Sequence, residues 1–529
     1  PVEDDAAQGG QGGALPEGPP EAPVAQLDFD IKELVFSWGE TERAESYRVE
    51  RKVDGDWHLE AETEDLTAEV AIALHLFDWK STEFRVSACN ADGCTAGEPI
   101  DATSAHLESI GYVKSASVSS ADVFGFIVAL DDTGTTLAVG RSAGVDVYHR
   151  DAAGWSFWQS IQEPLFANMT LSPDGTRVAI ATGDTYCSVH IYANIDGAWT
   201  WVRSFNKLVN TRCGALKLSA ANDTLALGVP DGIPGIPLSG GAIGMYTRSA
   251  VVVIHDPLGD EPSYFTIGYP MDRAGSEFGA SVAFDASGTR LAVGAPYENS
   301  VATGINGPMV DASATKDGAV FVYDLADDEW SRSAFIKSSV RLLDDWFGWA
   351  VAFSDDGKTL AVGAVNAGGD SAGIDASPGE ASPAASGSVW LFHEAEGDWY
   401  QDLLIKAPTL HQGASFGGSL ALSADGKTLA VGAPGDKGVD EGLLGDPLHA
   451  DQSIGAVHVY RKPASHWVAV SYVKPIVSRV GMTFAHAVDL SADGLTLAVG
   501  APYEEGRGTG LAADPTVLGA TTTGAVYLY

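Results

Sequence analysis

The chain has 529 residues, more than one hydrophobic core usually supports, so two or more domains are expected. Its 45% hydrophobic and 19% charged residues exclude wholesale disorder. The 71 acidic residues outnumber the 31 basic ones and give a formal net charge of -40, which argues against a nucleic-acid partner because such a surface repels phosphate backbones.

Residues 1–22 are rich in proline, glycine and acidic residues, a composition typical of a flexible linker. We interpret this segment as a tether that follows a removed export signal, which predicts an extracellular or cell-surface protein. No stretch approaches the roughly 18 consecutive apolar residues that a membrane-spanning helix needs, so no transmembrane segment is expected.

Residues 23–106 contain short segments that alternate apolar and polar residues, the pattern of half-buried strands. The region is the size of one β-sandwich domain, and its clearest strands are LVFSW, SYRVER, AEVAIAL and EFRVSA. Cys89 and Cys94 flank the turn in ACNADGC, where a hairpin brings two side chains within disulfide reach. We expect a disulfide between them.

Residues 107–529 contain an internal repeat whose best copies read like FGGSLALSADGKTLAVGAP. The repeat has seven copies, which begin at Phe124, Phe166, Cys213, Phe278, Phe347, Phe416 and Phe484. Repeated all-β units of this kind predict a seven-bladed β-propeller. The fold class expected for the whole chain is therefore all-β, a β-sandwich followed by a propeller.

Each unit contains an apolar strand, a Gly-containing turn, a second strand TLAVGAP, a loop, a Gly-Ala-Val strand and, after a tryptophan, a fourth strand. The last unit stops at Tyr529 after three strands, whereas residues 111–117 match the text of a fourth strand. We predict that this earlier strand completes the last blade and closes the ring, because the pairing removes two exposed sheet edges.

Tryptophans occur in two kinds of position. Five of them share one place in the repeat, which favours packing over ligand binding. These are Trp155, Trp199, Trp330, Trp399 and Trp467. Trp346 and Trp349 lie outside that place and are freer to bind a ligand.

Cys187 and Cys213 lie in neighbouring repeats. A disulfide between them is plausible, and the alternative of a metal site is weak because no Cys-x-x-Cys or Cys/His cluster is present. The disulfide expected at the first hairpin already suggests an oxidising compartment.

The text Ser-x-Asp-Gly-x-Thr-Leu-Ala-Val-Gly-Ala-Pro resembles the FG-GAP repeats of integrin α-subunit propellers and, more closely, those of bacterial exported proteins. The match spans residues 111–529. Residues 23–106 are similar to a fibronectin type III module, with Trp38 at the core tryptophan position of its second strand, Tyr47 at the start of the third and Phe84 in place of its corner tyrosine. The two resemblances imply an exported surface or matrix protein that binds a partner.

Calcium is the metal to consider, because integrin-like blades carry an Asp-x-Asp-x-Asp-Gly calcium loop at the first turn. This chain has shorter turns there, such as residues 423–426, and its acidic residues gather instead in Gly-rich loops after the second strands. Oxygen ligands on flexible loops suit Ca2+, and the alternative is that these acids are simply solvated. The candidate ligands are Asp311, Asp317, Asp436, Asp440, Glu504 and Glu505.

Catalytic motifs are weak. Two Gly-x-Ser-x-Gly matches, at residues 140–144 and 413–417, fall on repeat text without a following helix, so neither fits a nucleophile elbow. His458 and His486 occupy positions that vary among the repeats, which favours packed imidazoles over zinc ligands. A carbohydrate-active enzyme with paired carboxylates in the central channel is the less favoured alternative.

We therefore predict a non-enzymatic binding or adhesion protein whose propeller loops engage a protein or a glycan, because loops on one face are where such scaffolds usually bind partners. The loops of the fourth to seventh units are the longest. An alternative from a different class is a structural subunit that self-associates into a sheath or filament.

Overall fold

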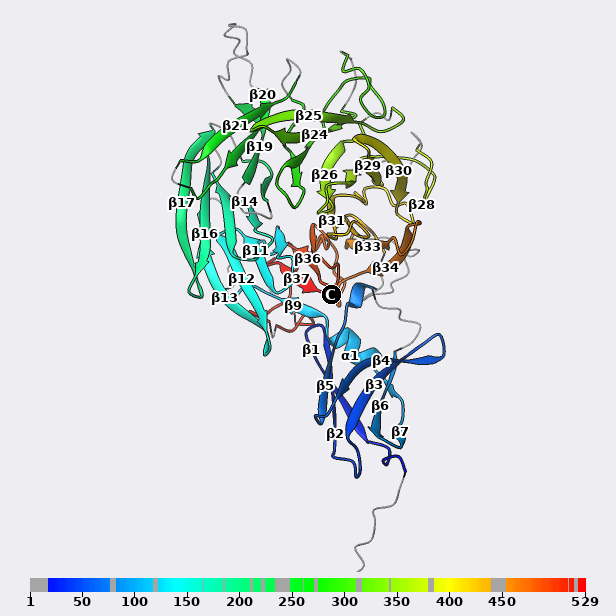
Figure 1. Cartoon of the computed structure of the whole chain (residues 1–529). Coiled ribbons are helices and arrows are strands. Elements are labelled where there is room, and N and C mark those ends of the chain that lie inside the picture. The colour runs from blue at the N-terminus through cyan, green and yellow to red at the C-terminus, as the bar shows by residue number, and fades with distance from the viewer. Residues whose placement is uncertain are drawn as a thin grey trace, which may run out of the picture. The chain divides into compact units, whose positions relative to one another are not determined.

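The computed structural model places the chain in two compact units, drawn in Figure 1. Residues 1–71 and 78–109 form the first unit, and residues 72–77 and 110–529 form the second. Residues 72–77, which lie inside the predicted first domain, thus belong to the second unit. The structure describes residues 18–76, 82–117, 122–164, 166–183, 186–209, 213–219, 224–233, 248–259, 261–270, 275–310, 316–341, 344–378, 385–438, 453–511, 513–517 and 522–529.

The first unit contains two antiparallel sheets and one short helix. One sheet has the order β1 (Ala25–Asp30), β2 (Glu33–Trp38), β5 (Thr67–Ala71). The other has the order β4 (Asp56–Thr63), β3 (Ser46–Val53), β6 (Glu83–Asn90), β7 (Gly93–Ala96), with β8 (Ile100–Asp101) also paired to β6. The helix α1 (Thr103–Glu108) follows β8, and the 3-10 turn η1 (Leu74–Leu76) belongs to the second unit.

Alternation along the strands builds the core of the first unit. In β2 every second residue is buried, so Phe36 and Trp38 point to the same side as Leu34. Phe36 meets Phe84 of the other sheet at a ring-centroid distance of 5.4 Å, and Trp38 meets Tyr47 at 5.2 Å. The two sheets therefore face each other across an aromatic core.

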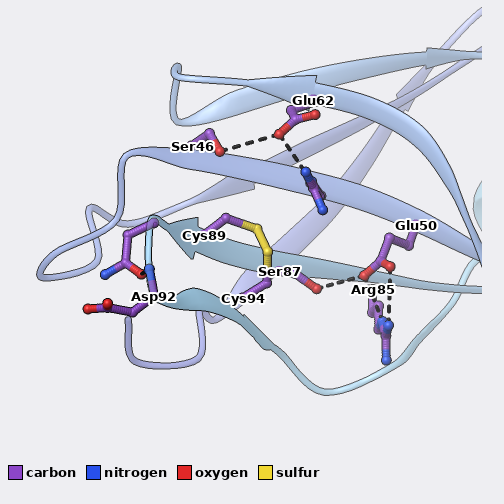
Figure 2. Close-up of a disulfide and its surroundings, with 10 residues drawn as sticks. Ser46, Glu50, Glu62, Arg85, Ser87, Cys89, Asp92 and Cys94 are labelled. Atoms are coloured by element: carbon purple, nitrogen blue, oxygen red, sulfur yellow. Dashed lines mark hydrogen bonds and ion pairs between the residues drawn. A yellow bond between two sulfur atoms is a disulfide. The ribbon is translucent and has the colours of Figure 1, made fainter. Parts of the chain in front are cut away.

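The predicted Cys89–Cys94 disulfide is confirmed (Figure 2). The two residues are direct partners in the β6–β7 hairpin, with Cα atoms 4.0 Å apart. On β6, Arg85 and Ser87 donate hydrogen bonds to Glu50 of β3 at 2.9 and 2.7 Å. Burial alone would raise the pKa of Glu50, but these donors hold the pKa below its usual value.

The described residues of the second unit form seven antiparallel sheets, which are numbered propeller sheets 1 to 7 in chain order, with the strands of each named from the innermost outward. Sheet 1 contains β10 (Val128–Leu130), β11 (Thr136–Arg141), β12 (Gly144–Asp151) and β13 (Gly154–Gln162). Sheet 2 contains β14 (Phe166–Leu171), β15 (Arg177–Thr182), β16 (Cys187–Ile195) and β17 (Ala198–Val209). Sheet 3 contains β18 (Leu216–Leu218), β19 (Thr224–Ile233), β20 (Arg248–His255) and β21 (Ser263–Gly268).

The remaining sheets follow the same pattern. Sheet 4 contains β22 (Ser281–Phe284), β23 (Arg290–Ala295), β24 (Ala319–Ala326) and β25 (Glu329–Ile336). Sheet 5 contains β26 (Phe347–Phe353), β27 (Thr359–Ala364), β29 (Ser388–Ala395), β30 (Asp398–Lys406) and the extra edge strand β28 (Gly373–Ile374). Sheet 6 contains β31 (Ser419–Leu422), β32 (Thr428–Ala433), β33 (Ala456–Arg461) and β34 (Val468–Val473), and sheet 7 contains β35 (Ala487–Leu490), β36 (Leu497–Ala501), β37 (Ala525–Leu528) and β9 (Gly111–Val113).

The predicted pairing of the segment at residues 111–117 with the last repeat is confirmed. β9 runs antiparallel to β37, with Tyr112 opposite Tyr527 and Val113 opposite Val526. The innermost strand of each sheet contacts that of the next, and β35 of sheet 7 contacts β10 of sheet 1, so the cycle is closed. Figure 1 shows these sheets side by side around a centre, which is the architecture of a β-propeller.

Backbone hydrogen bonds also link the first turns of neighbouring sheets near the axis. Ala492 N donates to Asp132 O at 2.9 Å and joins sheet 7 to sheet 1. Similar bonds of 2.7 to 3.0 Å join sheets 1 and 2, 4 and 5, 5 and 6, and 6 and 7. These short turns, most of which read Ser-x-Asp-Gly, therefore hold the inner ends of the sheets together.

The Phe that opens five of the seven repeats is fixed between two sheets. Phe124, Phe278, Phe347, Phe416 and Phe484 are all fully buried. Most of these rings pack on the third strand of their own sheet, as Phe278 does on Phe321 at 5.3 Å. The backbone of the same Phe lies against a glycine of the preceding sheet, as with Gly318 and Phe347, which form an isolated parallel bridge.

Candidate binding surface on the loop face

The loops of the second unit lie on two opposite faces. In an antiparallel sheet the connections after the second and fourth strands lie at one end, and the turns after the first and third strands lie at the other. We call the first end the loop face and the second the turn face. The predicted calcium ligands and Trp346 all belong to connections on the loop face.

Buried ion pairs support the loop face in sheets 4, 6 and 7. In each sheet the third residue after the second strand is an acid, and it meets a lysine at the end of the fourth strand. Every one of these charged side chains is at most 3% exposed. The pairs are Glu298–Lys337 (2.5 Å), Asp436–Lys474 (3.0 Å) and Glu504–Lys114 (2.8 Å).

Each acid also fixes the start of its own loop by accepting a backbone N–H from two residues further along. Ser300 N donates to Glu298 at 2.9 Å, Gly438 N to Asp436 at 3.0 Å and Gly506 N to Glu504 at 2.7 Å. A tyrosine hydroxyl donates to each acid as well; in sheet 7 this is the buried Tyr112, 2.8 Å from Glu504. Burial, reinforced by the Glu504 charge, raises the pKa of Tyr112 well above its usual range, so the hydroxyl stays a donor.

Two predicted calcium ligands are therefore already engaged in buried ion pairs. Asp436 and Glu504 are 1% and 0% exposed, and their carboxylates accept from lysine, tyrosine and backbone donors. Burial alone would raise the pKa of Asp436, but the neighbouring His411 and the Lys474 charge hold it well below its usual range.

The other predicted ligands are spread apart. Asp317 is buried and accepts a 3.1 Å hydrogen bond from Arg341, and Glu505 is exposed. Asp311 and Asp440 lie outside the described residues. Within the described parts of the chain, no three His, Cys, Asp or Glu side chains form a group that could hold a metal ion. Calcium binding stays a prediction that rests on the loops the structure does not describe.

Sheet 5 has the lysine of this arrangement without the acid. Lys406 is 1% exposed, but Ala367 occupies the position held by Glu298, Asp436 and Glu504 in the sister sheets. Lys406 Nζ donates to Gly387 O at 3.2 Å. Burial lowers the pKa of Lys406 to about 8, while the charge of Asp345 acts in the opposite direction. Lys406 therefore carries a buried charge near neutral pH without the acid that pairs with its sister lysines, and Asp345 offsets only part of the cost of burial.

Both singled-out histidines are packed. His458 is 3% exposed and lies between Phe416 and Tyr472, with ring centroids at 5.2 and 5.0 Å. Burial lowers its pKa to about 4, so the imidazole is neutral at physiological pH. His486 contacts Phe126 of sheet 1 at 4.5 Å. The structure thus places both rings in aromatic contacts, in line with the packing interpretation.

Aromatic side chains are exposed on the loop face. Trp155, Trp199, Trp399 and Trp467 are buried and Trp330 is partly buried, which agrees with their predicted packing role. Trp349, in contrast, is 41% exposed and stacks on Trp346 with a centroid distance of 5.6 Å and an interplanar angle of 23°. Tyr503 (41%) and Phe126 (38%) are also exposed, beyond the second strand of sheet 7 and just before the first strand of sheet 1.

An axial cavity of about 120 Å³ lies at the turn face. Residues from all seven propeller sheets line it, and its charged lining residues are Asp132, Lys217, Asp285, Asp355 and Asp489. Burial raises the pKa of Asp132 to about 6, and the charge of Asp355 adds to this effect. Such crowding of carboxylates shifts one or more of them toward the neutral form.

The Cys187–Cys213 disulfide is also present, with Cα atoms 5.1 Å apart. It joins the start of the third strand of sheet 2 to the segment that enters sheet 3. No described helix is long and apolar enough to cross a membrane.

Comparisons with known proteins show only distant likeness. No family model and no curated protein matches the chain. Among solved structures, the Cps50 (Swd1) β-propeller domain of Myceliophteria thermophila is 12% identical with a TM-score of 0.44, covering 79% of this chain and 99% of that chain. The hydrazine synthase of Kuenenia stuttgartiensis is 14% identical with a TM-score of 0.44, covering 74% of this chain and 96% of that chain. The fold assignment therefore rests on the closed cycle of sheets.

The buried ion pairs were not predicted from the sequence, although the acids and the lysines each recur in the repeats. The acids stand in PYE and PGD after the second strand, and the lysines end AFIK, SYVK and GYVK. The two halves lie far apart in sequence, 390 residues for Lys114 and Glu504. A comparison of the acid position with the lysine position across the repeats would have indicated the pairing. Sheet 5 is the exception, because it keeps the lysine without the acid.

Proposed function

We propose that this chain is an exported binding protein that engages an extracellular partner through the loop face of its propeller. The observation that carries the proposal is the exposure of aromatic side chains, above all Trp349, on a face whose loops are anchored by buried ion pairs. Exposed aromatic residues on a rigid support are the usual anchors of recognition surfaces. The partner is a protein or a glycan.

The proposed architecture is a seven-bladed propeller of the FG-GAP type preceded by a fibronectin type III-like module. Each propeller sheet is taken as one blade, with β9 completing the last. The two facing sheets of the first unit and its Phe36–Phe84 core support the module assignment. In this proposal the module acts as a spacer between a surface anchor and the propeller.

An oxidising location outside the cytoplasm is supported by the two disulfides. The net charge of -40 favours solubility in such a setting. Self-assembly into a sheath is the competing proposal, and sedimentation of the purified chain at rising concentration distinguishes it, because a binding protein stays monomeric.

The experiment that tests the proposal is an array of extracellular proteins and polysaccharides probed with the purified full chain. A loop-face variant, Tyr503→Ser with Trp349→Ser, is compared with a variant of two exposed aromatic residues on outer strands, Trp201→Ser with Tyr264→Ser. We expect the loop-face variant alone to lose its ligands. Equal losses in both variants, or no ligand of either class for the unaltered chain, would overturn the proposal.

A further inference from the structure

A cluster on the loop face between sheets 4 and 5 differs from its equivalents elsewhere in the ring. We call it the aromatic corner and define it as Tyr297, Lys316, Trp346 and Trp349. Tyr297 follows the second strand of sheet 4, and Lys316 precedes its third strand. The two tryptophans flank Phe347, the first residue of sheet 5. Two neighbouring sheets thus contribute to one surface.

The corner is held together by ring contacts and backbone bonds. Tyr297 packs edge-on against Trp346 at 5.5 Å, and Lys316 Nζ lies 3.8 Å from the centre of the Tyr297 ring. Trp346 N donates to Lys316 O, and Trp349 N donates to Trp346 O, both at 3.2 Å. The indole of Trp349 is therefore placed by its stack on Trp346 rather than left to rotate freely.

The backbone at Trp346 adopts a conformation that bulky residues avoid. Its φ is +59°, in the left-handed region. In the four other repeats that open with a fully buried Phe, the residue before that Phe has a similar φ, between +46° and +54°. The fold therefore imposes this conformation. Those positions hold Val123, Glu277, Ser415 and Thr483. Only sheet 5 places a tryptophan there, and this tryptophan stacks against Trp349.

The position of Trp349 is equally distinctive. The equivalent residues are Phe126, Ala280, Gly418 and His486. Sheet 5 alone among these five combines aromatic residues on both sides of the opening Phe. The result is an exposed flat indole that stacks on a second indole, with the ammonium group of Lys316 5.9 Å from the centre of that second ring.

Such a platform suits a pyranose ring better than a protein side chain. The C–H face of a sugar covers an indole, while its hydroxyl groups need charged or polar partners at the rim. Lys316 supplies donors, and the Arg341–Asp317 pair lies next to it along the chain.

We propose that the aromatic corner binds a pyranose unit of an extracellular polysaccharide, with the sugar ring stacked on Trp349 and Lys316 donating to its oxygen atoms. This inference rests on the proposed binding function and names its ligand class. A protein partner at the same face is the outcome that the experiment must distinguish from it.

The test is affinity electrophoresis of the full chain through gels that contain soluble neutral or uronic-acid polysaccharides, one polysaccharide per gel. We expect at least one polysaccharide to retard the unaltered chain, Trp349→Ala to weaken that retardation about tenfold or more, and Trp349→Phe to retain part of it. The control Trp201→Ala removes a 56% exposed indole on an outer strand and is expected to leave retardation unchanged.

The outcomes separate this inference from the proposed function. If Trp349→Ala is retarded like the unaltered chain, the aromatic corner is not the glycan site, although the binding function stands. If no polysaccharide retards the chain but an extracellular protein binds it, the glycan inference is wrong and the binding function stands. If neither class binds, both proposals fail. Circular dichroism of each variant excludes unfolding as the cause of a loss.

Discussion

Gly524 lies directly against Phe124 where the last propeller sheet meets the first. A Cβ atom built on Gly524 would approach the carbonyl oxygen of Phe124 to 2.0 Å, and Phe124 N donates to Thr523 O at 3.2 Å. Gly318, Gly387 and Gly455 have the same relationship to the opening Phe of the sheet that follows each of them. The glycine before the third strand is therefore a contact point between sheets.

We expect Gly524→Ala to destabilise the second unit by about 3 kcal/mol, since it combines a left-handed φ with a backbone clash. Gly413 offers a matched control, because its φ is also +76° but no atom lies within 4 Å of the position that an added methyl group would take. Gly413→Ala should cost only about 1 to 2 kcal/mol. Equal shifts in the thermal midpoint of the two variants would contradict the role assigned to the contact.

Lys406 and Lys474 occupy the same place in neighbouring sheets but should respond oppositely to substitution. Lys474→Met leaves Asp436 buried without its cation and should destabilise the second unit by about 3 to 5 kcal/mol. Lys406→Met removes a buried charge in a sheet that has Ala367 where sheets 4, 6 and 7 have the paired acid. This variant should stabilise the unit by about 1 to 3 kcal/mol at pH 7. Denaturant unfolding of both variants checks the opposite signs.

The Lys406 effect should also depend on pH. Its folded pKa of about 8 lies below the usual value of 10.5, so the folded state binds this proton less tightly than the unfolded state. The penalty is fully present below pH 8 and disappears as the pH rises toward 10.5. The stability difference between Lys406→Met and the unaltered chain should shrink over that interval, and a difference that is constant with pH would contradict this assignment.

Asp132 should respond to pH in the opposite sense. Its pKa is raised to about 6, so the neutral form is favoured in the folded state, and the associated stability is lost as the pH rises through about 6. Asp132→Asn should raise the thermal midpoint at about pH 7.5 and leave it nearly unchanged at about pH 4. Because Asp132 is partly exposed, the gain should stay below about 1 kcal/mol. A gain that is equal at both pH values would show that the charge is not the cause.

Removal of the Cys187–Cys213 disulfide should destabilise the second unit by about 3 kcal/mol, because the bridge spans 26 residues. The double variant with alanine at both positions is compared with the corresponding variant of Cys89 and Cys94, which spans 5 residues in the first unit. Calorimetry should show the loss in the transition of the second unit only for the former variant. A similar loss in that transition for both variants would be inconsistent with separate units.

Much of the architecture could be predicted because the repeat carries its own strand and turn signals. The alternating text, the Asp-Gly turns and the recurring tryptophan define antiparallel strands locally, and the unmatched strand at residues 111–113 predicts its pairing with β37. The Cys89–Cys94 disulfide could be predicted from its hairpin, whereas neighbouring repeats made the Cys187–Cys213 disulfide only plausible.

The chemistry of the loop face could not be predicted in the same way, since it depends on which strands the ring brings together. Asp436 and Glu504 look like loop acids in the sequence, but the sheets place a buried lysine beside each of them. The aromatic corner joins Tyr297 of one sheet to Trp346 of the next, a contact that no local pattern signals. The sequence indicated only that Trp346 and Trp349, outside the shared tryptophan position, are freer to bind a ligand, and of the two Trp349 is the more exposed.

The most direct test of the loop-face account is hydrogen–deuterium exchange of the full chain, with and without the polysaccharide or protein that binds it most tightly on the array. If partners bind the loop face, we expect slowed exchange in the connections after the second and fourth strands, including residues 344–349. Slowed exchange confined to the turn face or to the outer strands, with the loop face unchanged, would contradict it.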